Sequence, residues 1–135
     1  MNLKMLLSVY GALIAVSGAA FLVVPSALFS LLYGVPELDA LGLSLARMFG
    51  AAYIGLGVIC WTARTAEPSK ARDALILGLM VVNGLWAVVA VLAAMDAGLW
   101  LLWADAAGFA LVAVLFIVAG RRAMSAPTAG GGAST

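Results

Sequence analysis

Residues 74–95, with the sequence ALILGLMVVNGLWAVVAVLAAM, form a run of 22 residues that contains no charged side chain. An α-helix rises about 1.5 Å per residue, so about 20 apolar residues are enough to cross the hydrocarbon core of a bilayer. The run therefore predicts a membrane-spanning helix over residues 73–95, and the other elements are placed relative to it.

The composition of the whole chain agrees with a membrane location. Of its 135 residues, 66% are hydrophobic and 10% are charged, whereas about 25% of the residues in an ordinary soluble domain are charged. So few charged side chains cannot cover the surface that a globule of this size exposes to water. The composition predicts an integral membrane protein whose first partner is the lipid bilayer.

A second apolar run, at the start of the chain, is too long for one span. It holds 32 residues without a charge between Lys4 and Glu37. Pro25 interrupts it, because proline cannot donate the hydrogen bond that would continue the preceding helix. We expect a spanning helix over residues 4–24, followed by a short helix over residues 26–33 that lies in the membrane interface.

Two more spans complete the predicted fold. They cover residues 41–62 and 99–120, and the turn at residues 96–98 is short enough to make its flanking helices antiparallel neighbours. The fold class is thus an all-α integral membrane protein: an antiparallel bundle of four transmembrane helices, with a short interfacial helix between the first and the second. This domain covers residues 1–122, and the Gly-rich residues 123–135 are predicted to be a disordered cytoplasmic tail.

The distribution of charges predicts the orientation of the spans. Lysine and arginine side chains concentrate on the cytoplasmic side of membrane proteins. Six of the seven basic residues fall on one side of the predicted bundle, together with both termini, and three acidic residues fall on the other. The N- and C-termini are therefore expected in the cytoplasm. The six basic residues are Lys4, Arg64, Lys70, Arg72, Arg121 and Arg122, and the three acidic ones are Glu37, Asp39 and Asp96.

The sequence offers little for catalysis or for metal binding. It contains no histidine, and Cys60 is its one cysteine, so an internal disulfide and the usual zinc and haem sites are excluded. No basic block marks nucleic-acid binding. We expect no catalytic residues, no metal and no cofactor, because acid–base catalysis needs groups that titrate near the working pH.

Five of the polar side chains inside the predicted spans are candidates for a site. Arg47 and Asp105 each lie six or seven residues from the outer boundary, at a depth of roughly 10 Å, and Ser17 reaches a similar level. Asn83 and Tyr53 lie deeper, near the midplane. An intramembrane charge costs at least ~2.5 kcal/mol, so such residues usually face the interior of a bundle.

Matching depth predicts an ion pair between Arg47 and Asp105. Two other interpretations stay open: the two charges form a site for a ligand or ion, or Arg47 extends to the outer headgroups. Asn83 is expected to hydrogen-bond across helices, and Ser17 or Tyr53 to satisfy the donors that remain.

Small residues recur at helical spacing and predict close helix packing. Such stripes let backbones approach each other in lipid. They favour either a tight bundle within one subunit or an interface between subunits. The positions are Gly11, Ala15, Gly18, Gly50, Gly57, Ala87 and Ala90.

The segment from Leu45 to Trp61, LARMFGAAYIGLGVICW, places an arginine ahead of several glycines in an apolar helix. In this pattern, in the proline that closes the first helix and in overall length, residues 1–122 resemble small bacterial four-helix membrane proteins of unknown function. The resemblance implies a four-helix fold in the bacterial inner membrane and implies no activity. The residues that carry it are Arg47, Gly50, Gly55, Gly57 and Pro25.

Two functional hypotheses follow. The first is a non-enzymatic membrane protein that acts through helix association, as an accessory or scaffold subunit of a larger membrane complex or as a homo-oligomer. The alternative is a transport protein that binds a small solute or lipid at an intramembrane site made by Arg47 and Asp105.

Overall fold

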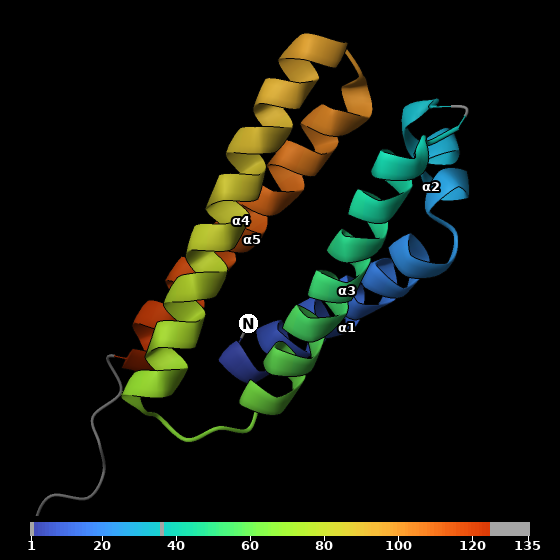
Figure 1. The fold of residues 1–135 in the computed structure, drawn as a ribbon. Helices are drawn as coiled ribbons and strands as arrows, with labels where there is room; N and C mark the ends of the chain where they lie inside the picture. The colour runs from blue at the N-terminus through green and yellow to red at the C-terminus, as the bar shows by residue number, and fades with distance from the viewer. Residues whose placement is uncertain (1, 36, 125–135) are drawn as a thin grey trace, which may run out of the picture.

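The computed structural model describes the chain except for residues 1, 36 and 125–135, and the described residues form α-helices joined by short loops. The boundaries fall within a few residues of the predicted ones. The predicted disordered tail lies outside the described residues, apart from residues 123 and 124, which continue the last helix. The helices are α1 (Leu3–Val23), α2 (Pro25–Tyr33), α3 (Ala40–Ala63), α4 (Lys70–Ala97) and α5 (Trp100–Met124) (Figure 1).

The break between α1 and α2 occurs where the sequence predicts it. Pro25 occupies the first position of α2, where the missing N–H group costs nothing because it would have no partner inside the helix. Gly34 ends α2 in the left-handed conformation, with a φ of 68°, which glycine adopts without a steric penalty. The short helix predicted between the first two long helices is therefore present.

Helix α4 begins earlier than its apolar run. The Ser69 hydroxyl accepts a hydrogen bond from the Arg72 N–H group, at 3.2 Å, and so caps the helix. The first turn, from Lys70, is therefore helical although it is charged. At the other end, Gly98 closes α4 with a φ of 66°. The absence of charge predicts where the apolar part begins, whereas the capping residue decides where the helix begins.

Four of the helices are long and apolar enough to cross a membrane: α1, α3, α4 and the part of α5 from Trp100 to Arg121. Large apolar side chains are exposed along them, including Leu13 at 64%, Met48 at 67% and Leu111 at 60%. Exposed apolar surface of this extent is typical of helices that face lipid. The fold is thus compatible with a membrane protein that has four spanning helices.

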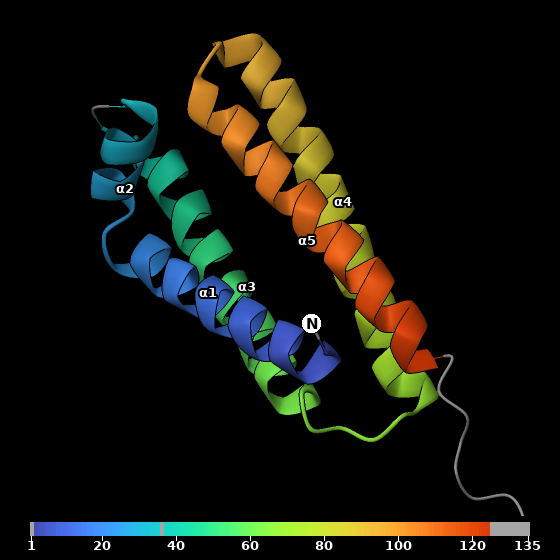
Figure 2. The same ribbon diagram turned by 180° about the vertical axis from the view of Figure 1, so that it is seen from behind.

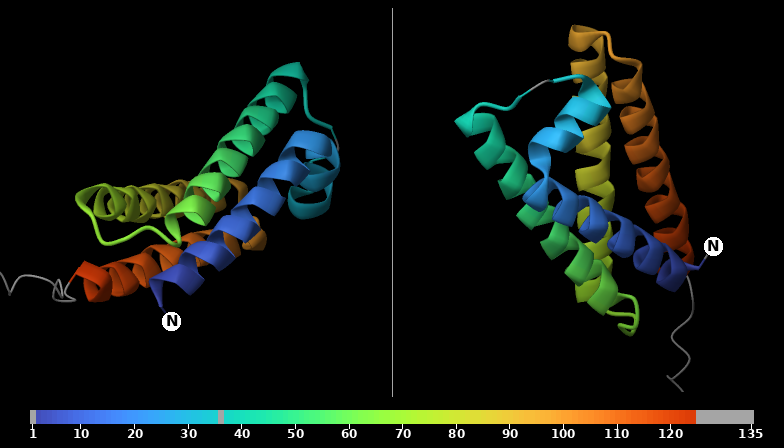
Figure 3. Two further views of the ribbon diagram at one scale, coloured as in Figure 1. Left: turned by 90° about the horizontal axis from the view of Figure 1, so that it is seen from below. Right: turned by 90° about the vertical axis from the view of Figure 1, so that its right-hand side faces the viewer.

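The long helices pack as two pairs, with α1 along α3 and α4 along α5. Figure 2 shows the two pairs from behind, and Figure 3 shows that α1 crosses α3. Contacts between the pairs are far fewer than contacts within them. The simple four-helix bundle predicted from the sequence is therefore divided into two units.

Glycines allow α1 and α3 to approach closely. A Cβ atom built on Gly18 would lie 2.6 Å from the Gly50 carbonyl oxygen, and one built on Gly57 would lie 2.7 Å from the Ala15 Cβ atom. Gly11 is similarly close to Cys60. Distances this short leave no room for a side chain. The small residues predicted on these two helices thus contact each other within one chain.

The buried core joins the two pairs at one end of the molecule. It lies where α1 and α4 begin and where α3 and α5 end. Toward the α2 end of the molecule, the space between the pairs is not closed by such a core. The core residues are Leu6, Leu7, Tyr10, Ile14, Cys60, Ile76, Leu79, Phe116 and Ala119.

A polar contact ties the pairs together inside this core. Asn83 of α4 is fully buried, and its amide nitrogen donates to the Tyr10 hydroxyl of α1 at 3.0 Å and to the Leu79 carbonyl at 2.8 Å. The Tyr10 ring also packs edge-on against Phe116 of α5, with centroids 5.3 Å apart. Asn83 thus makes the interhelical hydrogen bond expected from the sequence, and Asn83 itself does not line the cleft between the pairs.

Candidate functional site: an aromatic cleft between the helix pairs

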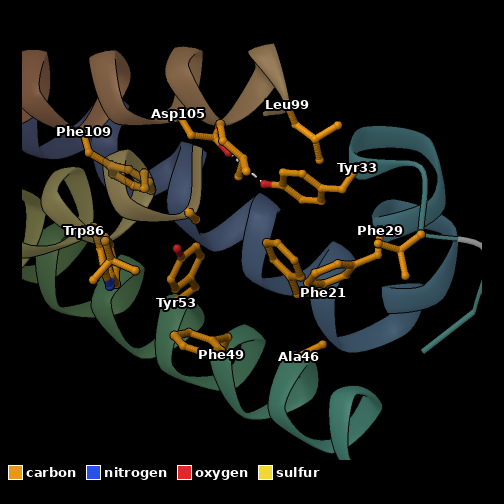
Figure 4. Close-up of a pocket in the computed structure, with 15 residues that line it drawn as sticks. Phe21, Phe29, Tyr33, Ala46, Phe49, Tyr53, Trp86, Leu99, Asp105 and Phe109 are labelled. Carbon is orange, nitrogen blue, oxygen red and sulfur yellow. Dashed lines mark hydrogen bonds between the residues drawn. The ribbon is translucent and has the colours of Figure 1, made fainter. Parts of the chain in front are cut away.

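A cleft of about 570 Å³ lies between the two helix pairs. Every helix contributes to its wall, and most of the lining side chains are apolar (Figure 4). Ala90 and Ala93 of α4 keep the wall free of bulk on one side. The lining residues are Phe21, Phe29, Tyr33, Val35, Ala46, Phe49, Tyr53, Trp86, Val89, Ala90, Ala93, Leu99, Leu102, Asp105 and Phe109.

Six aromatic rings form a continuous series of contacts around this cleft. Their centroids are 4.9 to 6.0 Å apart, within the range in which aromatic pairs attract each other. The series begins on α2, crosses α1, α3 and α4, and ends on α5. It thereby fixes the relative positions of all five helices at the cleft. In order, the rings belong to Tyr33, Phe29, Phe21, Tyr53, Trp86 and Phe109.

Asp105 is hydrogen-bonded to Tyr33, the first residue of this aromatic series, and lines the cleft together with Phe109, the last. The Tyr33 hydroxyl donates a hydrogen bond of 2.8 Å to Oδ2 of Asp105 (Figure 4). Asp105 is also four residues before Phe109 on α5, so the two side chains lie on the same face of that helix. Asp105 is the one charged side chain among the described residues that line the cleft. The cleft is therefore an aromatic enclosure with a single carboxylate.

Tyr33 acts as the donor in this contact. Burial raises the pKa of its phenol above the ordinary value, and the hydrogen bond to Asp105 and the charge of that carboxylate raise it further. A raised pKa keeps the proton on the phenol throughout the physiological pH range. Tyr33 therefore remains a neutral hydrogen-bond donor and cannot compensate the charge of Asp105.

A second hollow meets the cleft at Asp105. It has a volume of about 440 Å³ and shares Tyr33, Tyr53 and Asp105 with the cleft, and it extends between α1 and α5 to Ser17 and Gly108. The Tyr53 side chain points into the space between the pairs (Figure 4). Asp105 is thus accessible from two sides of the molecule.

Arg47 does not pair with Asp105. The ion pair predicted from the sequence is therefore wrong. Both residues are described; Arg47 is exposed on α3, and the carboxylate of Asp105 accepts from Tyr33 instead. Sequence distance gives the depth of a residue but not the direction in which its side chain points around the helix axis. The buried positions of α3 that lie nearest to Arg47 are Ala46 and Gly50, whereas Arg47 is exposed and lines neither the cleft nor the second hollow.

The remaining predicted residues divide between the two regions. Tyr53 lines the cleft, and the exposed Ser17 lines the second hollow. Ala90 is buried and also lines the cleft, whereas Ala87 borders a separate hollow between α4 and α5. Asn83 belongs to the core. The structure therefore does not bring the five polar residues together as one site.

Sequence reasoning missed Tyr33 and most of the aromatic series. The pattern did indicate a short apolar helix after Pro25, but it placed that helix flat in the interface, where an aromatic ring needs no partner inside the protein. In the structure α2 packs against α1 and α3, so that Tyr33 reaches α5. The sequence did offer one signal for this contact. The hydroxyl of Tyr33 can donate a hydrogen bond, and the carboxylate of Asp105, inside an apolar helix, needs a donor.

No metal-binding cluster occurs within the part of the chain that the structure describes, since no three histidine, cysteine or acidic side chains gather there. Asp105 is therefore not part of a multidentate acidic site in this region. Its neighbours are a phenol and aromatic rings, which are suited to organic ligands and not to coordination of a hard cation.

Comparison with known proteins gives one match. No curated protein and no solved structure matches the chain. A family model described as a domain of unknown function, DUF8292, matches residues 1–121. That range includes all four candidate spans, the short helix α2 and every residue of the cleft. The chain therefore belongs to the DUF8292 family.

Proposed function

We propose that this protein is a non-enzymatic membrane protein that binds a lipid-soluble organic ligand in the cleft between the α1–α3 and α4–α5 pairs. The observation that carries the proposal is the cleft itself: about 570 Å³, lined by aromatic and aliphatic side chains and one hydrogen-bonded carboxylate. Sites for small molecules are typically apolar cavities of this size with a few placed polar groups.

The packing of the glycines supports ligand binding over a role in helix association. Gly11, Gly18, Gly50 and Gly57 are the positions that favour a contact with another subunit, and all four are buried. Within the chain they are already in contact between α1 and α3. An accessory or scaffold role would therefore need another surface, and no specific feature of the described helices favours one.

The position of the cleft supports entry of the ligand from the lipid phase. The core closes the end where α1 begins, and the cleft lies toward the α2 end. The positive-inside rule assigns the first of these ends to the cytoplasmic side. In this orientation, which places both termini in the cytoplasm of a bacterial cell, the cleft opens within the outer half of the inner membrane.

Photolabelling in liposomes tests this proposal. A neutral alkyl diazirine is expected to label cleft residues such as Phe21 and Trp86 in a saturable way, because a site has a finite capacity, whereas the exposed Leu111 of α5 is labelled in proportion to probe concentration. Ala93→Trp fills the cleft and should abolish the saturable component. Ala52→Trp, on the exposed face of α3, is the matched control and should leave it intact.

Two outcomes would contradict the proposal. One is labelling of Phe21 and Trp86 that rises linearly with probe concentration, as for Leu111. The other is saturable labelling that survives Ala93→Trp in a variant whose thermal unfolding matches that of Ala52→Trp.

A further inference from the structure

The charge of the cleft indicates the chemical class of its ligand, if the cleft binds a ligand as proposed above. We propose that the ligand is a lipophilic organic cation, an ammonium or phosphonium with an apolar body. Its charge would lie beside Asp105, and its body would occupy the aromatic enclosure.

The carboxylate of Asp105 lacks a compensating cation. Its hydrogen-bond partner is the neutral hydroxyl of Tyr33, and Asp105 is the one charged residue among the described residues of the cleft wall. Arg47, the basic side chain at a similar depth, is exposed on α3. An uncompensated charge in an apolar environment is costly, and a positively charged ligand would remove that cost.

The rings around Asp105 also favour a cation. Tyr33, Tyr53 and Phe109 line both the cleft and the second hollow together with Asp105. The face of an aromatic ring attracts a cation within about 6 Å of its centroid, and enclosures of such rings are a recurring way to bind quaternary ammonium groups. A cation seated beside Asp105 would thus meet the carboxylate and the rings at once.

The size and polarity of the cleft exclude other ligand classes. An anionic headgroup would meet Asp105, with no basic group among the described lining residues to offset the repulsion. A small hydrated cation would lose its water shell in a wall that offers aromatic rings and one carboxylate. The body of the ligand must be apolar, because most of the wall is.

A pair of probes with opposite charge and similar shape tests the inference. Tetraphenylphosphonium and tetraphenylborate are titrated by equilibrium dialysis against the full-length protein in a non-ionic detergent. We expect saturable binding of the phosphonium and none of the borate, since only the sign of the charge differs. Asp105→Asn should weaken phosphonium binding by about tenfold or more, and Asp105→Glu should retain part of it.

Matched variants separate the charge effect from misfolding. Asp96→Asn removes an exposed carboxylate at the end of α4 and should leave phosphonium binding unchanged. Ala93→Trp should abolish binding without touching Asp105. If Asp105→Asn does not fold, as judged by thermal unfolding, the preference of the wild-type protein for phosphonium over borate decides the question by itself.

The outcomes distinguish this inference from the proposed function. Equal binding of the two probes, or phosphonium binding unchanged in folded Asp105→Asn, overturns the assignment of a cation but leaves ligand binding in place if diazirine labelling of the cleft is saturable. Absence of both phosphonium binding and saturable labelling overturns the two proposals together. If phosphonium reduces diazirine labelling of the cleft in the wild type but not in folded Asp105→Asn, both proposals are supported.

Discussion

Tyr33, the last residue of the short helix α2, donates a 2.8 Å hydrogen bond to Asp105 in the first two turns of α5. The two residues are 72 positions apart in the chain. Their contact joins the short helix α2 to α5, a helix of the α4–α5 pair. It is the polar link at the α2 end of the molecule, as the Tyr10–Asn83 contact is in the core. Tyr33 and Asp105 are also part of the wall of the cleft.

Loss of the Tyr33 hydroxyl should loosen the α2 end of the molecule. Tyr33→Phe removes one hydrogen bond to a charged group, so we expect the free energy of unfolding to fall by about 1.5–3 kcal/mol, toward the lower value because the contact is only partly buried. Reversible unfolding in mixed micelles measures the change. Phe29→Leu, which keeps the hydrogen bond, serves as a control for local repacking. A Tyr33→Phe variant as stable as the wild type would contradict the role given to this contact.

The glycines of the α1–α3 contact should tolerate no side chain. Gly18→Ala places a methyl group 2.6 Å from the Gly50 carbonyl oxygen, and overpacking of this kind costs about 1–3 kcal/mol. Gly55→Ala is the matched control, because nothing lies within 4 Å of its added Cβ atom; it should be neutral or stabilising by about 0.5–1 kcal/mol, since alanine favours a helix. Equal effects of the two substitutions on unfolding would refute the packing described for α1 and α3.

The buried contact between Tyr10 and Asn83 should show energetic coupling. Tyr10→Phe, Asn83→Ala and the double variant form a cycle whose interaction energy we expect at about 0.6–1.7 kcal/mol, the range for hydrogen bonds between membrane helices. Unfolding in mixed micelles gives all three values. Strict additivity of the two single losses would show that the hydrogen bond contributes nothing to stability.

The orientation of the spans can be tested with introduced cysteines. The native Cys60 is buried, so labelling reports on the new site. With cytoplasmic termini, a cysteine at Ala97 should react with a membrane-impermeant thiol reagent in intact cells, and one at Ser69 should react only after lysis. The reverse pattern would invert the topology and place the cleft in the inner half of the membrane.

The sequence predicted the helices well because the signals for them are local. Long apolar runs with at most one charge predicted the four long helices, and Pro25 predicted the break between α1 and α2. Capping by Ser69 moved the start of α4 from the predicted residue 73 to Lys70. Such differences arise because a charged first turn is compatible with a helix that extends beyond the apolar core of a membrane.

The site was less predictable because it depends on the direction of side chains and on the arrangement of the two pairs. Asp105 and Tyr53, two of the predicted site residues, do line the cleft, since a polar side chain in the middle of a long apolar helix can be recognised from the sequence alone. The partner of Asp105 was assigned to Arg47 by depth, whereas the structure gives Tyr33. The depth of a residue gives its position along the helix axis only. Two side chains at the same depth pair only if they also point toward each other from neighbouring helices.

Fluorescence of a single tryptophan tests the central claim, that the cleft is a ligand site, most directly. Trp86 lies in the cleft wall, within ring contact of Tyr53 and Phe109, and Trp100 is 76% exposed on α5. Two variants, each keeping one of these residues and replacing the other three tryptophans by phenylalanine, are titrated in liposomes with a neutral brominated hydrocarbon, which quenches on contact. We predict that quenching of Trp86 saturates while quenching of Trp100 rises linearly with the concentration in the bilayer. Linear quenching of both residues would contradict a ligand site in the cleft.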